Sequence, residues 1–136
     1  MGRVSYLLDA NIWSEMARAE RNPRVVRRFE AEAEYLAMPA PVADELTFGV
    51  ERLPNGQRRH RLREWLDHLL SSYPVLAFDA RAAVWHGAER ARRERFGTPA
   101  PFVDGLIAAI NRRISVVSRQ PFIPRSSPET ASILCN

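Results

Sequence analysis

The chain has 136 residues, of which 46% are hydrophobic, so it can bury one core but is too short for two independent domains. No apolar run approaches the roughly 20 residues that span a membrane, and the N-terminus lacks a signal-peptide pattern, so we expect a soluble, cytoplasmic protein. The net charge is +4 and all 20 basic residues are arginine, which favours polyanionic partners, although a genome rich in arginine codons would give the same bias.

The first third of the chain predicts one strand and two helices. Residues 3–8 end in an apolar run that stops at Asp9, which indicates a short buried strand. Apolar residues then recur at helical spacing over residues 10–20 and again from Pro23 to about Tyr35.

The middle of the chain predicts a turn, two helices and a second strand. Residues 35–41 contain two prolines, so we expect a short extended segment and a turn. Helical spacing resumes over residues 42–53 and, after a loop, over the strongly basic residues 58–73. The apolar run 74–78 then predicts a buried strand.

The last third predicts two helices and a third strand. Helical spacing covers residues 80–96, the sequence GTPAP interrupts it, and a short helix follows over residues 102–112. The apolar residues 114–118 predict a strand, whereas residues 120–136 show little periodicity. Strands that alternate with helices predict a single α/β domain over residues 1–136, with a mostly parallel sheet covered by helices on both faces.

Three acidic residues lie among apolar or small neighbours near the ends of predicted elements: Asp9, Glu45 and Asp104. A carboxylate is costly to remove from water unless it is paired or binds a metal, so three of them suggest one shared site. Cys135 is the single cysteine, and the three histidines have no metal-like spacing. Oxygen ligands without histidine or cysteine favour Mg²⁺ or Mn²⁺.

Each acid also has a simpler interpretation. Asp9 can cap the following helix, Glu45 can be an exposed helix residue, and Asp104 can be favoured by the dipole of its helix. Asp44 lies about 100° around the helix from Glu45 and is not expected to share an ion with it. Asp79 also follows a predicted strand, and we interpret it as a helix cap.

Other features have two interpretations as well. The arginine clusters at 58–63 and 89–95 can bind RNA or form solvated helix faces. Four apolar side chains at helical spacing are interpreted as core or dimer-interface residues: Trp13, Met16, Phe48 and Trp65. In the alternative interpretation, Trp13 and Phe48 line a groove for a partner helix.

Three motifs contain these acids: LLDANIWSE, ADELTFGVERLPNGQRR and TPAPFVDGLIAAI. Together they resemble the PIN-domain ribonucleases of the VapC toxin family. The first resembles the family's strand that ends in Asp, the second its motif with a Glu, and the third its motif in which an Asp opens a helix. The motifs occur in the family's order, and the resemblance covers residues 4–119.

The resemblance implies a PIN-like three-layer α/β/α fold and a Mg²⁺-dependent endoribonuclease. It also implies a toxin that forms a homodimer and is inhibited by a VapB-type antitoxin, with RNA as substrate and Mn²⁺ as a possible substitute metal. Asp9, Glu45 and Asp104 would be the acidic ligands, and Asn11 would orient Asp9 or a metal-bound water.

The C-terminal part departs from the family pattern. Ser118 and Arg119 fit the family's strand end, Gln120 fits imperfectly, and Ile123 stands where a fourth acid is expected. Glu129 is the one acidic residue after Asp104. A second hypothesis is therefore a catalytically weakened PIN-like module that binds antitoxin or RNA.

Overall fold

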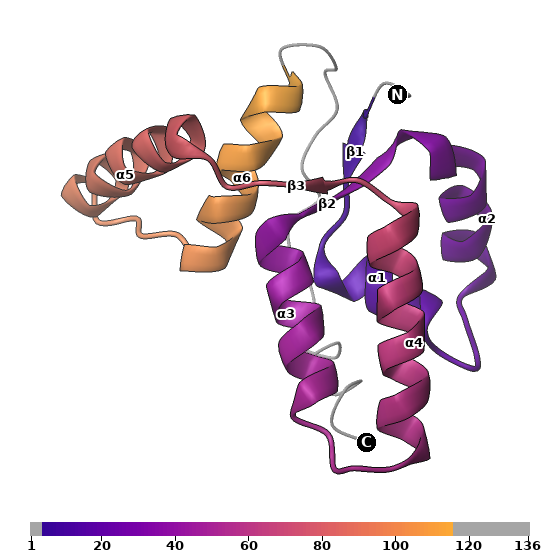
Figure 1. Ribbon diagram of the computed structural model, residues 1–136. Coiled ribbons are helices and arrows are strands. Elements are labelled where there is room, and N and C mark those ends of the chain that lie inside the picture. The colour runs from indigo at the N-terminus through magenta and orange to yellow at the C-terminus, as the bar shows by residue number, and fades with distance from the viewer. Residues whose placement is uncertain (1–3, 116–136) are drawn as a thin grey trace.

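The computed structural model describes residues 4–115, in which three short parallel strands form a sheet. β1 (Tyr6–Leu7) pairs with β2 (Leu36–Pro39), and β2 pairs with β3 (Val75–Leu76), so β2 is the central strand (Figure 1). The strands follow one another in chain order across the sheet, and helices connect them. The predicted α/β fold with a parallel sheet is confirmed.

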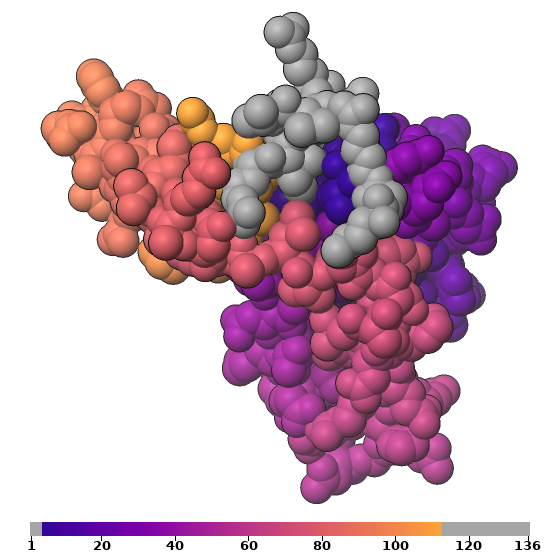
Figure 2. Space-filling model, turned by 45° about the horizontal axis from the view of Figure 1, so that its top comes forward, coloured from indigo at the N-terminus to yellow at the C-terminus, as the bar shows by residue number. Residues whose placement is uncertain are grey.

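Helices make up most of the described chain. Their bounds are α1 (Ala10–Met16), α2 (Pro23–Glu32), the 3₁₀ helix η1 (Ala33–Tyr35), α3 (Ala40–Glu51), α4 (Gln57–Ser72), α5 (Ala80–Arg95) and α6 (Phe102–Ser115). α3 packs against α1, α4 and α6, while α5 packs mainly against α6. α5 and α6 extend to one side of the body formed by the other helices (Figures 1 and 2). No helix within residues 4–115 has the length and apolarity to cross a bilayer.

The central strand differs from the sequence prediction. Residues 36–39 were expected to form an extended segment leading into a turn, but they form β2, and all four are buried. Pro39 ends the strand and Pro41 lies in the first turn of α3, where a missing backbone N–H costs no helical hydrogen bond. The prolines therefore mark a strand that leads directly into a helix.

The other two predicted strands also need correction. The run at 74–78 forms only the two-residue β3, and Val75 is 42% exposed, so this strand is not buried as predicted. Of the strand predicted at 114–118, Ile114 and Ser115 belong to α6, and the remaining residues lie outside the described part.

α1 ends earlier than predicted, at Met16 instead of about residue 20. The Glu15 carboxylate accepts hydrogen bonds from the backbone N–H of Asn22, at 2.8 Å, and from the Arg18 guanidinium, at 3.0 Å. These two bonds lower the pKa of Glu15. They hold the chain in a turn that leads to α2, whose N-cap is Asn22.

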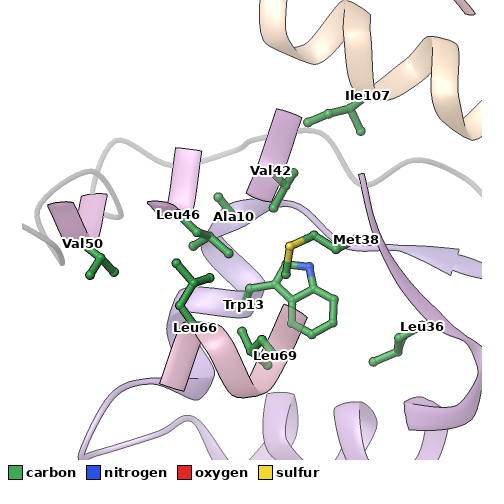
Figure 3. Packing of buried hydrophobic residues seen from close by; sticks show 10 residues of the cluster. All are labelled: Ala10, Trp13, Leu36, Met38, Val42, Leu46, Val50, Leu66, Leu69 and Ile107. Atoms are coloured by element: carbon green, nitrogen blue, oxygen red, sulfur yellow. The ribbon is translucent and has the colours of Figure 1, made fainter. Parts of the chain in front are cut away.

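Trp13 lies at the centre of the core, where its side chain is fully buried (Figure 3). Its indole N–H donates a hydrogen bond of 3.2 Å to the carbonyl of Leu8, and its ring meets those of Phe29 and Tyr73 edge-on. The buried cluster around it comprises Ala10, Leu36, Met38, Val42, Leu46, Val50, Leu66, Leu69 and Ile107. Residues from β2 and from α1, α3, α4 and α6 therefore share one core.

The predicted apolar residues have different positions. Trp13 is a core residue as expected, and Trp65 packs partly buried against the core. Phe48 is 64% exposed, so its assignment to the core is wrong, and its interface role stays a prediction. A partner groove lined by Trp13 is also excluded, because no part of that side chain reaches the surface.

Candidate functional site

Asp9 lies between the end of β1 and the start of α1. Its backbone is extended, and its Oδ1 accepts a hydrogen bond of 3.1 Å from the backbone N–H of Ile12. The predicted alternative, a helix cap, is therefore part of its role. Among residues 4–112, the range whose side chains the structure describes, the Asp9 carboxylate forms no other hydrogen bond or ion pair. Its second oxygen has no partner within this range.

Asp79 has nearly the same backbone and cap geometry after β3. Its Oδ1 accepts a hydrogen bond of 3.0 Å from the backbone N–H of Ala82, which confirms its interpretation as a cap. Asp9 and Asp79 therefore cap their helices in the same way. Of the two, only Asp9 lies in a motif, LLDANIWSE, that resembles the first motif of the VapC family.

Glu45 lies on α3 beside the face that is buried in the core. Its side chain is half-buried, whereas Asp44 is exposed, so the interpretation of Glu45 as a fully exposed helix residue is wrong. Leu46 and Gly49, which belong to the second motif ADELTFGVERLPNGQRR, are both buried. The half-buried position of Glu45 and the exposed position of Asp44 agree with the choice of Glu45 as the candidate metal ligand.

Asp104 lies in the first turn of α6, where a negative charge is favoured by the helix dipole. Asp104 is half-buried, and Ile107, one turn later, belongs to the core cluster. Asn11 is also half-buried, in the first turn of α1, and its side chain forms no hydrogen bond among residues 4–112, whose side chains the structure describes.

The three acids come from elements that meet at one core. Ala10 follows Asp9, Leu46 follows Glu45, and Ile107 follows Asp104 by one turn; all three neighbours belong to the buried cluster. Within the described residues, however, no three His, Cys, Asp or Glu side chains lie close enough to hold a metal ion. The shared site therefore stays a prediction, although its donors, all oxygen atoms, suit Mg²⁺ or Mn²⁺.

Asp9 and Asp104 line different concavities. The first, here called the Asp9 hollow, has a volume of about 340 Å³. Its lining comes from β1 and the residues around it, from α1, α2 and α6: Ser5, Tyr6, Leu7, Leu8, Asp9, Ile12, Arg24, Val25, Arg28, Phe29, Glu32, Leu36, Ile107 and Asn111. The candidate ligand thus faces a largely apolar surface that carries two arginines.

The second concavity, of about 470 Å³, lies between α5 and α6 and includes Asp104. Its other charged side chains are Glu89, Arg90, Arg93 and Glu94. Arg90 lies over the ring of Phe102, with 5.5 Å between the guanidinium carbon and the ring centre. Glu45 lines neither hollow.

Sequence reasoning missed Arg24 and Arg28 as neighbours of Asp9. Their spacing of four residues places them on one side of α2, which was a usable signal. That this side adjoins the end of β1 depends on how the helix packs, so the sequence alone did not connect them with Asp9.

Comparisons with known proteins agree on one family. The profile described as "PIN domain" matches residues 6–118. Plasmid stability protein StbB of Pseudomonas syringae pv. tomato is 35% identical over 108 residues, which cover 76% of this chain and 78% of that protein. Toxin FitB of Neisseria gonorrhoeae is 33% identical over 116 residues, which cover 81% of this chain and 82% of that protein.

The crystal structure of FitAcB from Neisseria gonorrhoeae is similar in fold. It superposes with a TM-score of 0.72 at 32% sequence identity, over 80% of this chain and 81% of that one. The similarity therefore extends over most of both chains.

Proposed function

The chain belongs to the PIN domain family, and from this premise we propose that it is the toxin of a toxin–antitoxin pair and a Mg²⁺-dependent endoribonuclease. Two similar proteins support the biological role by their names, a plasmid stability protein and the toxin FitB. The resemblance of the three acidic motifs to VapC ribonucleases supports the chemistry. RNA would be the substrate, and hydrolysis of a phosphodiester bond would be the reaction.

The observation that carries the proposal is the position of Asp9. Its carboxylate is oriented at the end of β1 by the hydrogen bond from the Ile12 N–H, while its second oxygen has no partner among residues 4–112. It also lines a hollow of about 340 Å³. A fixed oxygen ligand that faces an open surface is what a catalytic metal site requires.

Each residue of the site would have a defined task. Asp9, Glu45 and Asp104 would provide the carboxylates that hold a divalent cation, Mg²⁺ or in its place Mn²⁺. Asn11, in the first turn of α1, would orient Asp9. When bound, the cation supplies charge neutralisation at a phosphoryl group and activation of water for attack.

The proposal includes protein partners. A VapB-type antitoxin would bind the toxin, and two toxin chains would form a homodimer; the similarity to FitB and FitAcB supports this assignment. The test has two steps: the adjacent upstream reading frame should encode a small protein, and that protein should co-purify with the toxin after co-expression.

The test of catalysis is the substitution Asp9→Asn, with Asp79→Asn as the matched control. Asparagine caps helices about as well as aspartate, so both variants should keep their fold. Cleavage of an RNA by the wild type should require Mg²⁺ and should stop with EDTA. Asp9→Asn should lower the rate by about 100-fold or more, because even indirect partners of a metal ligand contribute about 10- to 100-fold. Asp79→Asn should cleave like the wild type.

Two results would count against this catalytic role. Unchanged Mg²⁺-dependent cleavage by Asp9→Asn would exclude Asp9 from the reaction. An equal loss in Asp9→Asn and Asp79→Asn would show that removing the negative charge of a helix cap, and not losing a metal ligand, is responsible.

Ile123, at the position where the family has a fourth acid, favours a second candidate function. The chain would then be a PIN-like module that binds antitoxin or RNA without efficient cleavage. This candidate predicts retained antitoxin binding together with no Mg²⁺-dependent cleavage by the wild type. Ile123 lies outside the described residues, so the activity of the purified full chain is the deciding measurement.

A further inference from the structure

Two arginines of α2 border the same hollow as Asp9. Arg24 and Arg28 are four residues apart, so their side chains lie on one side of the helix, and both line the Asp9 hollow. Arg27, on the same helix, is exposed and does not line the hollow. Arg24 and Arg28 therefore differ from Arg27 only in where they lie, because they line the hollow and Arg27 does not.

Neither Arg24 nor Arg28 is paired with a carboxylate among residues 4–112, the range whose side chains the structure describes. Their guanidinium groups form no ion pair or hydrogen bond within this range. Other arginines are paired: Arg59 and Arg63 share Glu51, and Arg92 and Arg93 share Glu89. Among the described side chains, two guanidinium groups without a partner thus line the same hollow as the candidate catalytic carboxylate.

The hollow also contains one group that would oppose an anion. Glu32, one turn after Arg28 on α2, is half-buried and lines the same surface. Its charge is not paired with Arg28 by an ion pair within the described residues. An anion bound at the two arginines would therefore be repelled by Glu32. Removing the charge of Glu32 should strengthen anion binding, whereas removing either arginine should weaken it.

We propose that Arg24 and Arg28 bind the phosphate backbone of single-stranded RNA as it enters the Asp9 hollow. The inference rests on the proposed function, in which the phosphodiester must lie at Asp9. A guanidinium matches phosphate geometry with two parallel N–H donors, and phosphate contacts position a nucleic acid without reading its sequence. The competing occupant of the same surface is an acidic protein segment, which the experiment separates from RNA.

The test measures RNA binding without catalysis. The full-length protein in EDTA is titrated against a labelled single-stranded RNA whose 2′-O-methyl groups prevent cleavage, at several salt concentrations. Arg24→Ala and Arg28→Ala should each weaken binding by about tenfold, as expected when hydrogen bonds to a charged group are lost. Each should also reduce the slope of log K against log salt by about 0.7, the value for one contact with a single strand.

Two control variants make the result specific. Arg27→Ala removes an equal charge from the same helix and should change neither the affinity nor the slope appreciably. Glu32→Gln should tighten RNA binding. Because all these side chains are on the surface or half-buried, circular dichroism should show the same fold in every variant.

The inference is overturned if Arg24→Ala and Arg28→Ala bind RNA as well as Arg27→Ala does, or if the wild type does not bind RNA. It is also overturned if the two variants lose only the co-expressed antitoxin, because the occupant would then be a protein. Since no metal or cleavage is involved, failure of the nuclease proposal is seen separately, as intact RNA in the Mg²⁺ assay.

Discussion

At the scale of single residues, His86 and Gly105 make a close contact between α5 and α6. His86 is only 9% exposed, and its ring meets those of Phe78 and Phe102 edge-on, with 5.9 and 5.3 Å between centres. A Cβ atom at Gly105 would lie 2.6 Å from His86 Nε2. Gly105 directly follows Asp104, so this contact helps to determine where that carboxylate lies.

The substitution Gly105→Ala should therefore destabilise the protein. We expect a loss of roughly 1–3 kcal/mol, the usual cost of overpacking, because the added methyl group would force the His86 ring away from its contacts with Phe78 and Phe102. Gly87→Ala is the matched control, since Gly87 lies in α5 with nothing within 4 Å of an added Cβ. It should stabilise by about 0.5–1 kcal/mol through helix propensity. Urea unfolding measures both, and equal stability of the two variants would show that His86 moves freely.

At the scale of elements, α5 contains its own network of charges. Glu89 accepts hydrogen bonds from Arg92, at 2.6 and 2.8 Å, and from Arg93, at 3.0 Å. These bonds lower the pKa of the Glu89 carboxyl to about 2. A lowered pKa in the folded protein means that the network stabilises the fold above the ordinary pKa of glutamate, and that this contribution is lost as the pH falls towards 2.

The pKa of Glu89 is a direct measure of this network. A ¹³C NMR titration of the carboxyl should give a value of about 2 in the wild type. In the double variant Arg92→Gln, Arg93→Gln, the pKa should rise towards the ordinary value of 4.5, because both donors are removed. Arg81→Gln, on the same helix without an ion pair in the described part of the chain, should leave it unchanged. A similar pKa in all three proteins would mean that the network does not persist in solution.

At the scale of the whole molecule, burial is concentrated around β2 and decreases towards α5. All residues of β2 are buried, and the backbone N–H of Met38 donates to the carbonyl of Pro74 at 3.0 Å. By contrast, every residue from 91 to 95 at the end of α5 is exposed. α5 packs mainly against α6, at the side of the body (Figure 1).

Hydrogen exchange should follow this gradient. The amides of Ala37 and Met38 should exchange slowest, at a rate that reflects unfolding of the whole domain, because no smaller motion exposes β2. Amides in the last two turns of α5 should exchange faster, by partial opening of that helix. The measurement is exchange followed residue by residue by NMR, and uniform protection of β2 and α5 would contradict a single core at β2.

Long amphipathic segments were predictable, while short elements were less so. The helices at 23–32, 57–72 and 80–95 were recognisable because several apolar residues repeat at helical spacing in each. β2 was not recognised as a strand, because four residues that include a proline give no periodicity, and only pairing with β1 and β3 makes them a strand. Asp9, Glu45 and Asp104 were found as acids among apolar or small neighbours and then through motif resemblance, whereas their relation in space had no local signal.

The amino-acid sequence by itself determined the family, the α/β class and the candidate acids, because these depend on residue types at short spacings. The tertiary structure decided which of the two caps, Asp9 or Asp79, lines a hollow with two arginines that are unpaired among the described side chains. It also decided that Phe48 is exposed and that Arg24 and Arg28 line the same hollow as Asp9. Such relations depend on how the helices pack on the sheet. Packing brings residues together in space whatever their separation along the chain, so the sequence does not reveal which of them meet.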